Sequence, residues 1–495
     1  MPTPPSAPAA RDEPVIRERG DACPGALRLH AADDGYLARV RIPGGMLGEE
    51  AARLLADAAD RLGDGHIDLT SRGNAQLRGL GASCGGELAE VLDRAGLLPT
   101  PTHERVRNVV ASPLTGLDGR GLPDVAPWVA ELDRLLCADP DTAALSGRFL
   151  FALDDGRGDV ASLDADVTVV ARDAEHALLY VATSPAAPTA VPAPVDAAAD
   201  GPTPGGADGS AGVAERAVLV SAADVPRAAV AAARYFLDAV RAAGTRAWRV
   251  VELPAEHALH AAGLADRLKA VGVPATAVTA PGPVPAGVGG AAVPQGVRSA
   301  GAARPDGPGP EPGLVGGVGG LGGVGGSVAV SVVAPLARLT TAQWRLLAGL
   351  TGRMRLTPWR GIVVPGLPVD RAPQALAALT AAGLVTDPDD PWRSVTACTG
   401  RPGCAKSLAD VRADARAVAA RATGPLPVHW SGCERRCGHP RGTAWVDLVA
   451  TPAGYDLSVA GGSPPHLGGL KTPDHLAAAL ASARRTTSHD DAAKK

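Results

Sequence analysis

The sequence predicts a fold of mixed helices and strands in which one strand–helix–strand unit occurs twice. Residues 36–42 alternate apolar and polar side chains, as a half-buried strand does, and residues 49–62 carry apolar side chains at helical spacing. The same order recurs about 290 residues later, with a strand over 327–333 and a helix over 340–350. A chain of 495 residues is long enough to form two or more domains.

Each predicted helix leads into a second strand that contains a Leu-Thr step. This step lies at Asp68-Leu-Thr70 in the first unit and at Arg355-Leu-Thr357 in the second. We interpret the two units as a duplication whose halves pack about a pseudo-twofold axis. The alternative is a chance similarity between two common strand–helix segments.

The rest of the chain is predicted to alternate strands and helices. Between the units we expect a strand running into a turn over 105–114, strands over 147–153, 167–171 and 247–253, and helices over 127–137 and 225–243. Near the end we expect a long helix over 405–422, strands over 443–448 and 454–459, and a short helix near His475.

Composition and periodicity together divide the chain into seven segments. Two stretches rich in Gly, Pro and Ala lack the large side chains that a core needs, so we expect them to be flexible. The expected segments are a disordered lead (1–24), a first half-domain (25–98), a larger domain without paired cysteines (99–280) with a flexible insertion (184–214), a low-complexity linker (281–326), a second half-domain (327–386), a cysteine-bearing domain (387–483) and a tail (484–495).

The charge and cysteine content limit the classes of partner and the compartment. The net charge is −4, which gives no electrostatic basis for binding nucleic acid or a membrane surface. No segment is typical of a membrane span or a signal peptide. Cys23, Cys84 and Cys137 are scattered, unlike a disulfide framework, so we expect a cytoplasmic protein.

Four of the seven cysteines form two close pairs, Cys398 with Cys404 and Cys433 with Cys437. Four thiolates brought to one point suit either zinc or an iron–sulfur cluster. Structural zinc sites usually have two to four residues between paired cysteines, and the gap of five is wider, which favours the cluster. A helix starting beside Cys404 would direct its positive end at that anionic group. Zinc and unliganded core cysteines are the alternatives. Four glycines flank the thiols and allow close backbone approach: Gly400, Gly403, Gly432 and Gly438.

This C-x5-C and C-x3-C arrangement resembles that of the sirohaem nitrite and sulfite reductase family, whose four cysteines hold a [4Fe–4S] cluster. The residues that flank Cys398 and Cys433 are more similar to one branch of that family, the precorrin-3B synthases. Residues 39–45, 69–79 and 107–113 are similar to further segments of the family. The resemblance implies an α+β fold with two ferredoxin-like half-domains and two cluster-type α/β domains, of which only the second keeps its cysteines.

The sequence departs from the reductases where they hold their small anion with two arginines and two lysines. The arginines correspond to Arg39 and Arg107, whereas the lysines correspond to Arg148 and Leu150. A unit charge at 4 Å contributes roughly 4 kcal/mol at an effective dielectric of 20, so losing a cation argues against a reductase. Further departures lie at Asp68, at Gly73, and at Trp359 and Arg360.

The resemblance implies roles for individual residues. The candidate catalytic residues are Arg39, Arg107 and Arg148. Precorrins carry many carboxylates, which arginines and amides can bind. The candidate substrate-binding residues are Thr70, Arg72, Asn74, Gln76, Arg78, Arg355, Thr357 and Arg360. The alternative for the arginines is ordinary exposure at the surface.

The resemblance also implies a reaction, in which an oxygen-dependent monooxygenase hydroxylates precorrin-3A at C20 and forms a γ-lactone. Its partners would be precorrin-3A, dioxygen and a reductase or ferredoxin that passes on electrons from NAD(P)H. A mononuclear non-haem iron is expected beside the [4Fe–4S] cluster. A sirohaem-dependent sulfite or nitrite reductase is one alternative, and a non-catalytic iron–sulfur or zinc protein that binds tetrapyrroles is another. Candidate ligands of the mononuclear iron, by residue type alone, are His66, His103, His439 and His466.

Overall fold

The computed structural model describes residues 21, 23–120, 122–182, 216–279, 309–316, 326–440, 444–460 and 467–485. Most of the predicted lead, the predicted insertion over 184–214, the tail from 486 and His466 lie outside the described residues. Among the residues that are described, no helix is both long enough and apolar enough to cross a membrane.

Two of the sheets belong to the duplicated units, and each contains an edge strand from the other unit. The first sheet has the order β1 (His30–Ala32), β2 (Gly35–Val40), β5 (Ala75–Leu80), β4 (His66–Leu69) and β14 (Arg338–Thr340). The second has the order β12 (Gly313–Val315), β13 (Ser327–Val333), β16 (Gly361–Pro368), β15 (Arg353–Leu356) and β3 (Met46–Gly48). A reciprocal exchange of this kind is what a pseudo-twofold axis produces. It confirms the predicted duplication.

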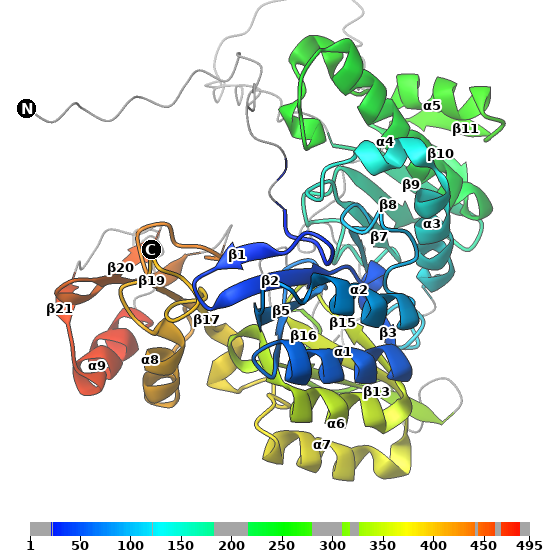
Figure 1. Ribbon diagram of the computed structural model, residues 1–495. Helices are drawn as coiled ribbons and strands as arrows, with labels where there is room; N and C mark the ends of the chain where they lie inside the picture. The colour runs from blue at the N-terminus through cyan, green and yellow to red at the C-terminus, as the bar shows by residue number, and fades with distance from the viewer. Residues whose placement is uncertain are drawn as a thin grey trace, which may run out of the picture.

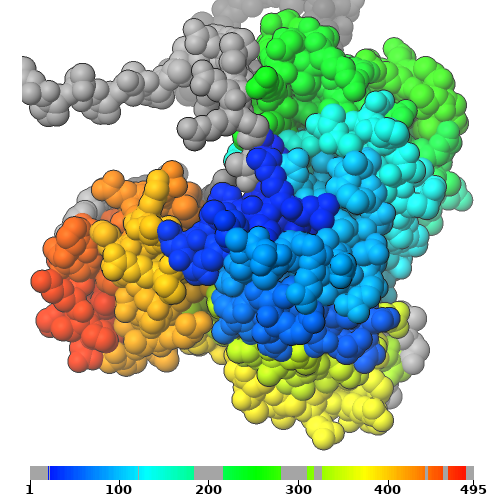
Figure 2. Space-filling view, in the orientation of Figure 1, coloured from blue at the N-terminus to red at the C-terminus, as the bar shows by residue number. Residues whose placement is uncertain are grey.

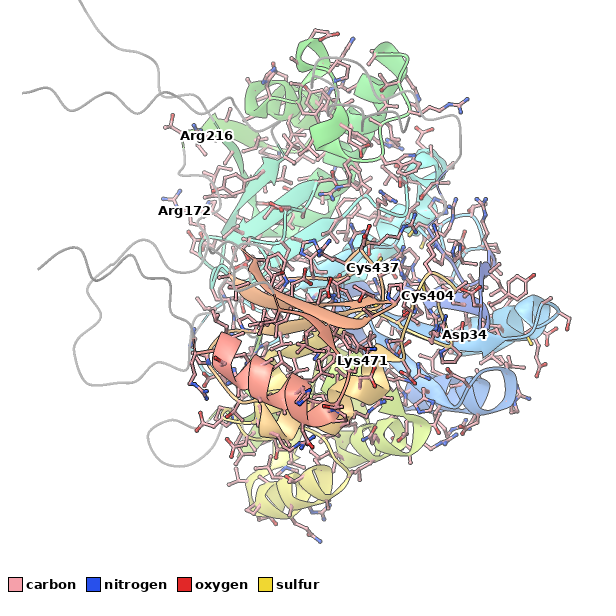
Figure 3. All side chains as sticks on the ribbon, turned by 90° about the vertical axis from the view of Figure 1, so that its left-hand side faces the viewer. Asp34, Arg172, Arg216, Cys404, Cys437 and Lys471 are labelled. Carbon is pink, nitrogen blue, oxygen red and sulfur yellow. The ribbon has the colours of Figure 1, made fainter. Side chains whose placement is uncertain are left out.

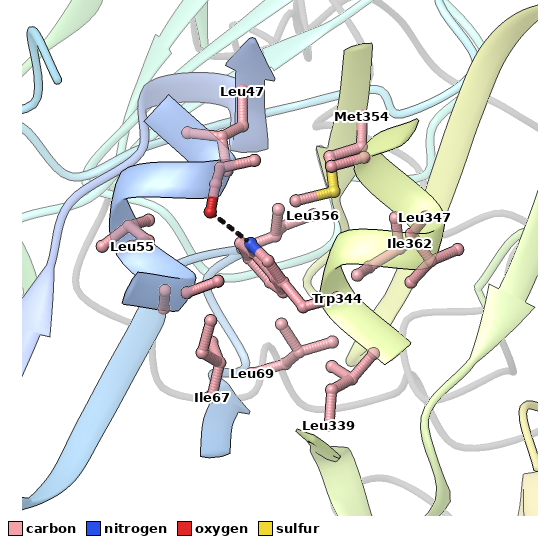
Figure 4. Packing of buried hydrophobic residues seen from close by; sticks show 14 of the residues in the cluster. Leu47, Leu55, Ile67, Leu69, Leu339, Trp344, Leu347, Met354, Leu356 and Ile362 are labelled. Atoms are coloured by element: carbon pink, nitrogen blue, oxygen red, sulfur yellow. Dashed lines mark hydrogen bonds between the residues drawn. The ribbon is translucent and has the colours of Figure 1, made fainter. Parts of the chain in front are cut away.

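The two half-domains share one hydrophobic core between their helices. Figure 1 shows α1 (Glu49–Leu62) and α6 (Thr341–Thr351) side by side, with α2 (Gly85–Arg94) and α7 (Ala372–Ala381) farther out. Trp344 is fully buried in this interface, and its indole N–H donates to the Ala52 carbonyl at 2.9 Å (Figure 4). A buried indole with a satisfied N–H fixes how the two helices meet.

The other two sheets also repeat one design, because each begins with three parallel strands and continues antiparallel. In order, the third sheet contains β11 (Ala275–Val278), β10 (Ala217–Ser221), β9 (His176–Val181), β8 (Val167–Ala171), β7 (Phe151–Asp154) and β6 (Val109–Ala111). The fourth contains β17 (Val395–Ala397), β18 (Val428–Ser431), β19 (Trp445–Thr451), β20 (Gly454–Ala460) and β21 (Leu467–Leu470). The predicted duplicated α+β fold is therefore confirmed.

Helices cover these sheets and complete separate cores. The third sheet carries α3 (Ala126–Ala138), α4 (Val225–Ala242) and α5 (Ala261–Ala270), and the fourth carries α8 (Val411–Val418) and α9 (Pro473–Ala483). In Figure 2 the fourth sheet and its helices, coloured orange to red, form a lobe beside the blue first half-domain. The cysteine pairs lie in this C-terminal lobe.

Three local predictions were wrong. The helix expected over 405–422 is only α8 (Val411–Val418) and one short turn, because the backbone at Arg401 and Leu408 bonds to Ala409 and Gly432 instead. The strand expected over 247–253 is a 3-10 turn at Val250–Glu252. There the Val250 N–H donates to the Asp166 carboxylate, so it is unavailable to a sheet.

The third error concerns the predicted linker over 281–326. Strand β12 lies inside this segment and pairs with β13 at the edge of the second sheet. The Gly-rich flanks of β12 are poor strand formers, so its few apolar residues gave no sequence signal of a strand.

Candidate functional site

The cysteine loops follow two neighbouring parallel strands and therefore meet at one edge of the fourth sheet. Cys398 follows β17 directly, and Cys433 follows β18 after Gly432. Burial raises the pKa of the Cys398 thiol, the Gly432 N–H that donates to its Sγ at 3.2 Å opposes this, and nearby Cys437 and Cys404 raise the pKa further. Figure 3 shows Cys404 and Cys437 near one another in that view. At least three of the four predicted metal-binding cysteines are thus brought together.

The surroundings of these thiols are formed by glycine-rich loops. In the part of the chain that the structure describes, no three His, Cys, Asp or Glu side chains converge on a point that would hold a single ion. Glycine is required where the loops pack, since a Cβ at Gly432 would lie 1.9 Å from Ser407 Oγ. The donor set is all thiol, as iron–sulfur clusters prefer. Cys398, Cys404, Cys433 and Cys437 remain the predicted ligands of a [4Fe–4S] cluster.

Arg78 anchors the Cys404 loop to the first half-domain. Its guanidinium is buried, and Nε and Nη2 each donate to Asp34 at 2.8 Å. Nη2 also donates to the Gly403 carbonyl at 2.9 Å, and the Ala405 N–H bonds to the carboxylate of Asp33. Arg78 was predicted to bind substrate, but its donors are engaged within the protein.

A second group of basic side chains surrounds the Gly147 carbonyl. Arg41 donates to this oxygen at 3.1 Å and Arg72 at 3.4 Å. Burial and the positive charges of Arg41 and Arg249 together lower the pKa of Arg72 to about 10. Because cations that crowd one another are stabilised by an added anion, this group is suited to bind one.

The segments that form the first and second sheets match the sequences of a known family. The model of the nitrite/sulfite reductase ferredoxin-like half domain matches residues 30–94 and again residues 322–382. These two segments contain the paired strands and helices of the duplicated units.

Both duplicated units of this chain are therefore similar to the ferredoxin-like half domain of nitrite and sulfite reductases.

Relatives that span most of the chain have two different names. The chain is 24% identical over 453 residues to a precorrin-3B synthase from Sinorhizobium sp, which covers 90% of this chain and 84% of the relative. It is 25% identical over 460 residues to a ferredoxin–nitrite reductase from Synechococcus elongatus, which covers 88% and 80%. The structure of the Mycobacterium tuberculosis NirA protein has the same fold, with a TM-score of 0.58 at 20% identity over 90% of this chain and 79% of that one.

Of the three arginines predicted to be catalytic, only Arg39 lies in the basic group around the Gly147 carbonyl. Arg39 is next to Cys23 and donates to the Gln76 side chain at 3.1 Å. Arg107 is buried and paired with both carboxylate oxygens of Asp133, at 2.7 and 2.6 Å. Arg148 is exposed and lies 4.7 Å from the ring centre of Trp248.

Several residues predicted to bind substrate hold the backbone instead. The Thr70 hydroxyl accepts from the Asn74 N–H at 3.1 Å, and the Thr357 hydroxyl accepts from the Gly361 N–H at 3.1 Å. Arg355 donates to the carbonyls of the turn over 113–115 at 3.0 and 2.7 Å. The Asn74 amide is buried and bonds to the Ile42 N–H and to Asn108.

Leu150, which corresponds to a lysine of the reductases, lies near Trp359, a departure in the second unit. Leu150 is buried in a small apolar cluster with Val110 and Ala152, and Trp359 of the second unit packs against that cluster. An apolar contact therefore occupies the place where the reductases carry a cation. This environment disfavours a small inorganic anion.

The histidines proposed by type as iron ligands are dispersed. His103 uses both ring nitrogens, at 2.9 Å from Thr102 and 2.9 Å from the Asp139 carbonyl. His66 lies near the surface beside Asp64, and His439 stacks on Trp445. These three histidines do not form one metal site.

Two residues of the site were not among the predicted ones. Arg41 is buried at the centre of the basic group, and His429 is fully buried beside the cysteine loops. Burial and the positive charge of Arg360 together lower the pKa of His429 to about 3. The signal in the sequence was the alternation in 428–431, where polar His429 and Ser431 separate apolar residues just before Cys433.

A groove of about 620 Å³ lies elsewhere, between α3, α4 and α5. Figure 1 shows these helices far from the C-terminal lobe that carries the cysteines. The arginines of the groove are paired with aspartates, such as Arg234 with Asp139 at 2.6 Å. The groove is therefore separate from the candidate site.

Proposed function

We propose that this protein is a precorrin-3B synthase, an oxygen-dependent monooxygenase that hydroxylates precorrin-3A at C20 and forms a γ-lactone. The observation that carries the proposal is the position of Leu150 in an apolar cluster against which Trp359 packs. The reductases need a lysine at this position. The similarity to the Sinorhizobium enzyme along 90% of the chain supports the same conclusion. A large organic substrate tolerates such an apolar wall, whereas sulfite or nitrite does not.

Two regions of the chain would have different roles: the basic group around Gly147 would bind the substrate, and the cysteine loops would hold the cluster. Arg39, Arg41 and Arg72 would bind carboxylates of the macrocycle, since guanidinium groups pair with carboxylates in a bidentate manner. The Gln76 amide, which accepts from Arg39, would orient that arginine. The pKa of Arg72 is lowered to about 10, so it remains protonated at neutral pH and available to an anion.

Cys398, Cys404, Cys433 and Cys437 would hold the [4Fe–4S] cluster, which when bound supplies one-electron transfer. Arg78 and Asp34 would keep the Cys404 loop in place through the Gly403 carbonyl. The electrons would come from NAD(P)H through a reductase or a ferredoxin, in keeping with the ferredoxin named for the Synechococcus relative. A cytoplasmic location agrees with cysteines that must stay reduced.

The runner-up is a sirohaem-dependent nitrite or sulfite reductase. It is favoured by the 25% identity to a ferredoxin–nitrite reductase over 88% of the chain, nearly equal to the other match. Under this alternative the basic group around Gly147 would bind the carboxylates of sirohaem rather than those of a substrate.

Purification without air followed by absorption and EPR spectroscopy separates these functions. We expect a [4Fe–4S] signal, no extractable sirohaem, and conversion of precorrin-3A to a product that gains one oxygen atom from labelled dioxygen. Stoichiometric sirohaem together with nitrite or sulfite reduction would establish the reductase. A cluster-containing protein that binds tetrapyrroles but turns over neither substrate would be non-catalytic.

A further inference from the structure

The outer face of α4 carries a stripe of charged side chains of both signs. Asp224 caps the start of the helix, and Arg227, Arg234, Asp238 and Arg241 follow it on the same face, because their spacings are those of one side of an α-helix. The side chains of the three arginines are 51%, 50% and 57% exposed, in chain order. This face of α4 is therefore open to a partner.

Apolar side chains lie beside the charged stripe. The groove of about 620 Å³ between α3, α4 and α5 runs along it and is lined by Leu135 of α3, by Val230 and Ala231 of α4, and by Val271 after α5. The side chain of Val271 is 53% exposed. An exposed apolar surface with charged residues at its rim is typical of a contact between proteins.

The order of the charges makes this stripe complementary to itself. Two copies of α4 can lie antiparallel about a twofold axis between positions 232 and 233. Arg227 of one copy is then opposite Asp238 of the other, and Asp224 is opposite Arg241. Each of these four charges meets an opposite charge, as an interface with twofold symmetry requires of a single surface.

The neighbouring registers lack this complementarity. In the antiparallel register described above, Arg234 is opposite Ala231, so the central arginine meets no like charge. Sliding one copy by about one helical turn places Arg227 opposite Arg234 or Arg241 of the second copy instead. Arginines that face one another repel, so the charges select one register.

The ion pairs within one copy leave donors for the second copy. Arg227 donates to Asp224 at 3.1 Å and to the Val271 carbonyl at 3.2 Å, and Arg241 donates to Asp238 at 3.0 Å. A guanidinium has five N–H donors, so each of these arginines can bind a second carboxylate. Exposed pairs contribute little singly, whereas close charge pairs that lose water at an interface contribute more.

We infer that the outer face of α4 is a self-association surface, on which two copies of this chain pair antiparallel with Arg227 of each copy bound to Asp238 of the other. The stripe from Arg227 to Arg241 is about 21 Å long, so the contact is small and the dimer is weak and reversible. Figure 1 shows α4 far from the C-terminal lobe, so the cysteine loops of both copies stay accessible. The inference does not depend on the proposed function.

Sedimentation equilibrium of the full chain between about 1 and 100 µM tests the surface. We expect the average mass to rise with concentration toward that of two chains. Arg227→Asp and Asp238→Arg each bring like charges together and should raise the dimer Kd at least about tenfold. The double variant exchanges the two charges and should return the Kd to within about threefold of wild type. Arg53→Asp, an equal charge change at an exposed position of α1, is the matched control.

Substitutions at Ala231 test the register without removing an ion pair. Ala231→Glu places a carboxylate opposite Arg234 of the second copy and should lower the dimer Kd, whereas Ala231→Arg should raise it. Both residues are good helix formers, so both variants should fold. The chain carries a net charge of −4, so a further glutamate by itself would increase the repulsion between copies. A lower Kd for Ala231→Glu is therefore specific to the pairing.

Three results would overturn the inference. The first is a chain that stays monomeric up to about 100 µM, whose α4 face would then be free for another protein. The second is a dimer whose Kd is unchanged in both single variants, since another face would hold it. The third is a folded double variant that does not recover. Circular dichroism and melting temperature identify a misfolded variant, in which case equal Kd values for Ala231→Glu and Ala231→Arg decide against the pairing.

Discussion

The third and fourth sheets place different chemistry on the same framework. In both, the loops after the first two parallel strands meet at one edge. After β6 and β7 these loops carry Ser112 and the acidic segment 154–159. After β17 and β18 they carry the two cysteine pairs. The comparison shows how equivalent loops differ when groups of the chain itself satisfy their charges and hydrogen bonds and when they do not.

The carboxylates of the acidic loop over 154–159 are all paired within the protein. The Asp154 carboxylate accepts from four backbone N–H groups, those of Gly156, Gly158, Val160 and Ala161. Arg157 pairs with Asp155 at 2.6 Å and with Asp118 at 2.8 Å, and Ser112 donates to Asp159 at 2.6 Å. Every charge there has a partner, so the loop has no vacancy for a ligand.

The cysteine loops are satisfied differently. Among the described residues, the Cys398 thiol has backbone donors such as the Gly432 N–H, and no ion pair to a thiol is present. Arg78 bonds to the Gly403 carbonyl, and Arg436 pairs with Asp447 rather than with a thiol. The comparison teaches that the same backbone framework can hold an acidic loop closed by ion pairs or a loop whose thiols are left to backbone donors.

Loss of a cysteine should give the largest effect. We expect Cys404→Ser to abolish the iron–sulfur signal, because a hydroxyl is a much weaker iron ligand than a thiolate. Iron and sulfide content and the EPR spectrum measure this, and Cys84→Ser, outside the lobe, is the matched control. An intact cluster spectrum in Cys404→Ser would remove Cys404 from the ligand set.

Removing the internal cation should destabilise the acidic loop strongly. Arg157→Met leaves Asp155 buried without its partner, which costs about 3–5 kcal/mol of unfolding free energy. Chemical denaturation followed by circular dichroism measures it. The control is Arg134→Met, whose fully exposed pair with Glu131 on α3 should leave the free energy of unfolding nearly unchanged. Equal losses in the two variants would show that the acidic loop is not self-supporting.

The acidic loop should also make stability depend on pH. Burial and the charge of Asp154 together raise the pKa of Asp159 to about 8. Because the folded pKa lies above the unfolded one, this carboxyl favours folding below about pH 4 and loses that contribution as the pH rises through 8. Asp159→Asn should therefore gain roughly 3–4 kcal/mol relative to wild type between pH 5 and pH 8.

Melting temperatures measured across this pH range test the effect. The control is Asp266→Asn, an exposed position on α5, which should run parallel to wild type. If the Asp159→Asn curve also runs parallel to wild type, Asp159 is ionised in the folded protein.

The smallest effect should come from the turns that the two half-domains share. Thr70→Val and Thr357→Val each remove one hydroxyl that accepts a backbone N–H, so each should cost about 1 kcal/mol. Chemical denaturation would compare them. A clearly larger loss at Thr70, or a weakened tetrapyrrole affinity there alone, would show that the two turns have diverged in function.

Local patterns were sufficient for much of the fold. Helix α1 and strands β8 and β13 have the predicted bounds, because their apolar periodicity is uninterrupted. The segments over 247–253 and 405–410 were wrong, since their backbone groups bond to Asp166 and to the cysteine loops. Such partners are distant in sequence and leave no periodic signal.

The sequence by itself determined the duplication and the four cysteines, because spacing and repetition are properties of the chain order. Only the tertiary structure decided which arginines are available. Arg78, Arg107 and Arg355 are held by other parts of the chain, whereas Arg360 has no described partner. An arginine in a sequence looks the same whether it meets Asp133 or a ligand. The physical reason is that availability depends on charges and carbonyls that folding brings together from far along the chain.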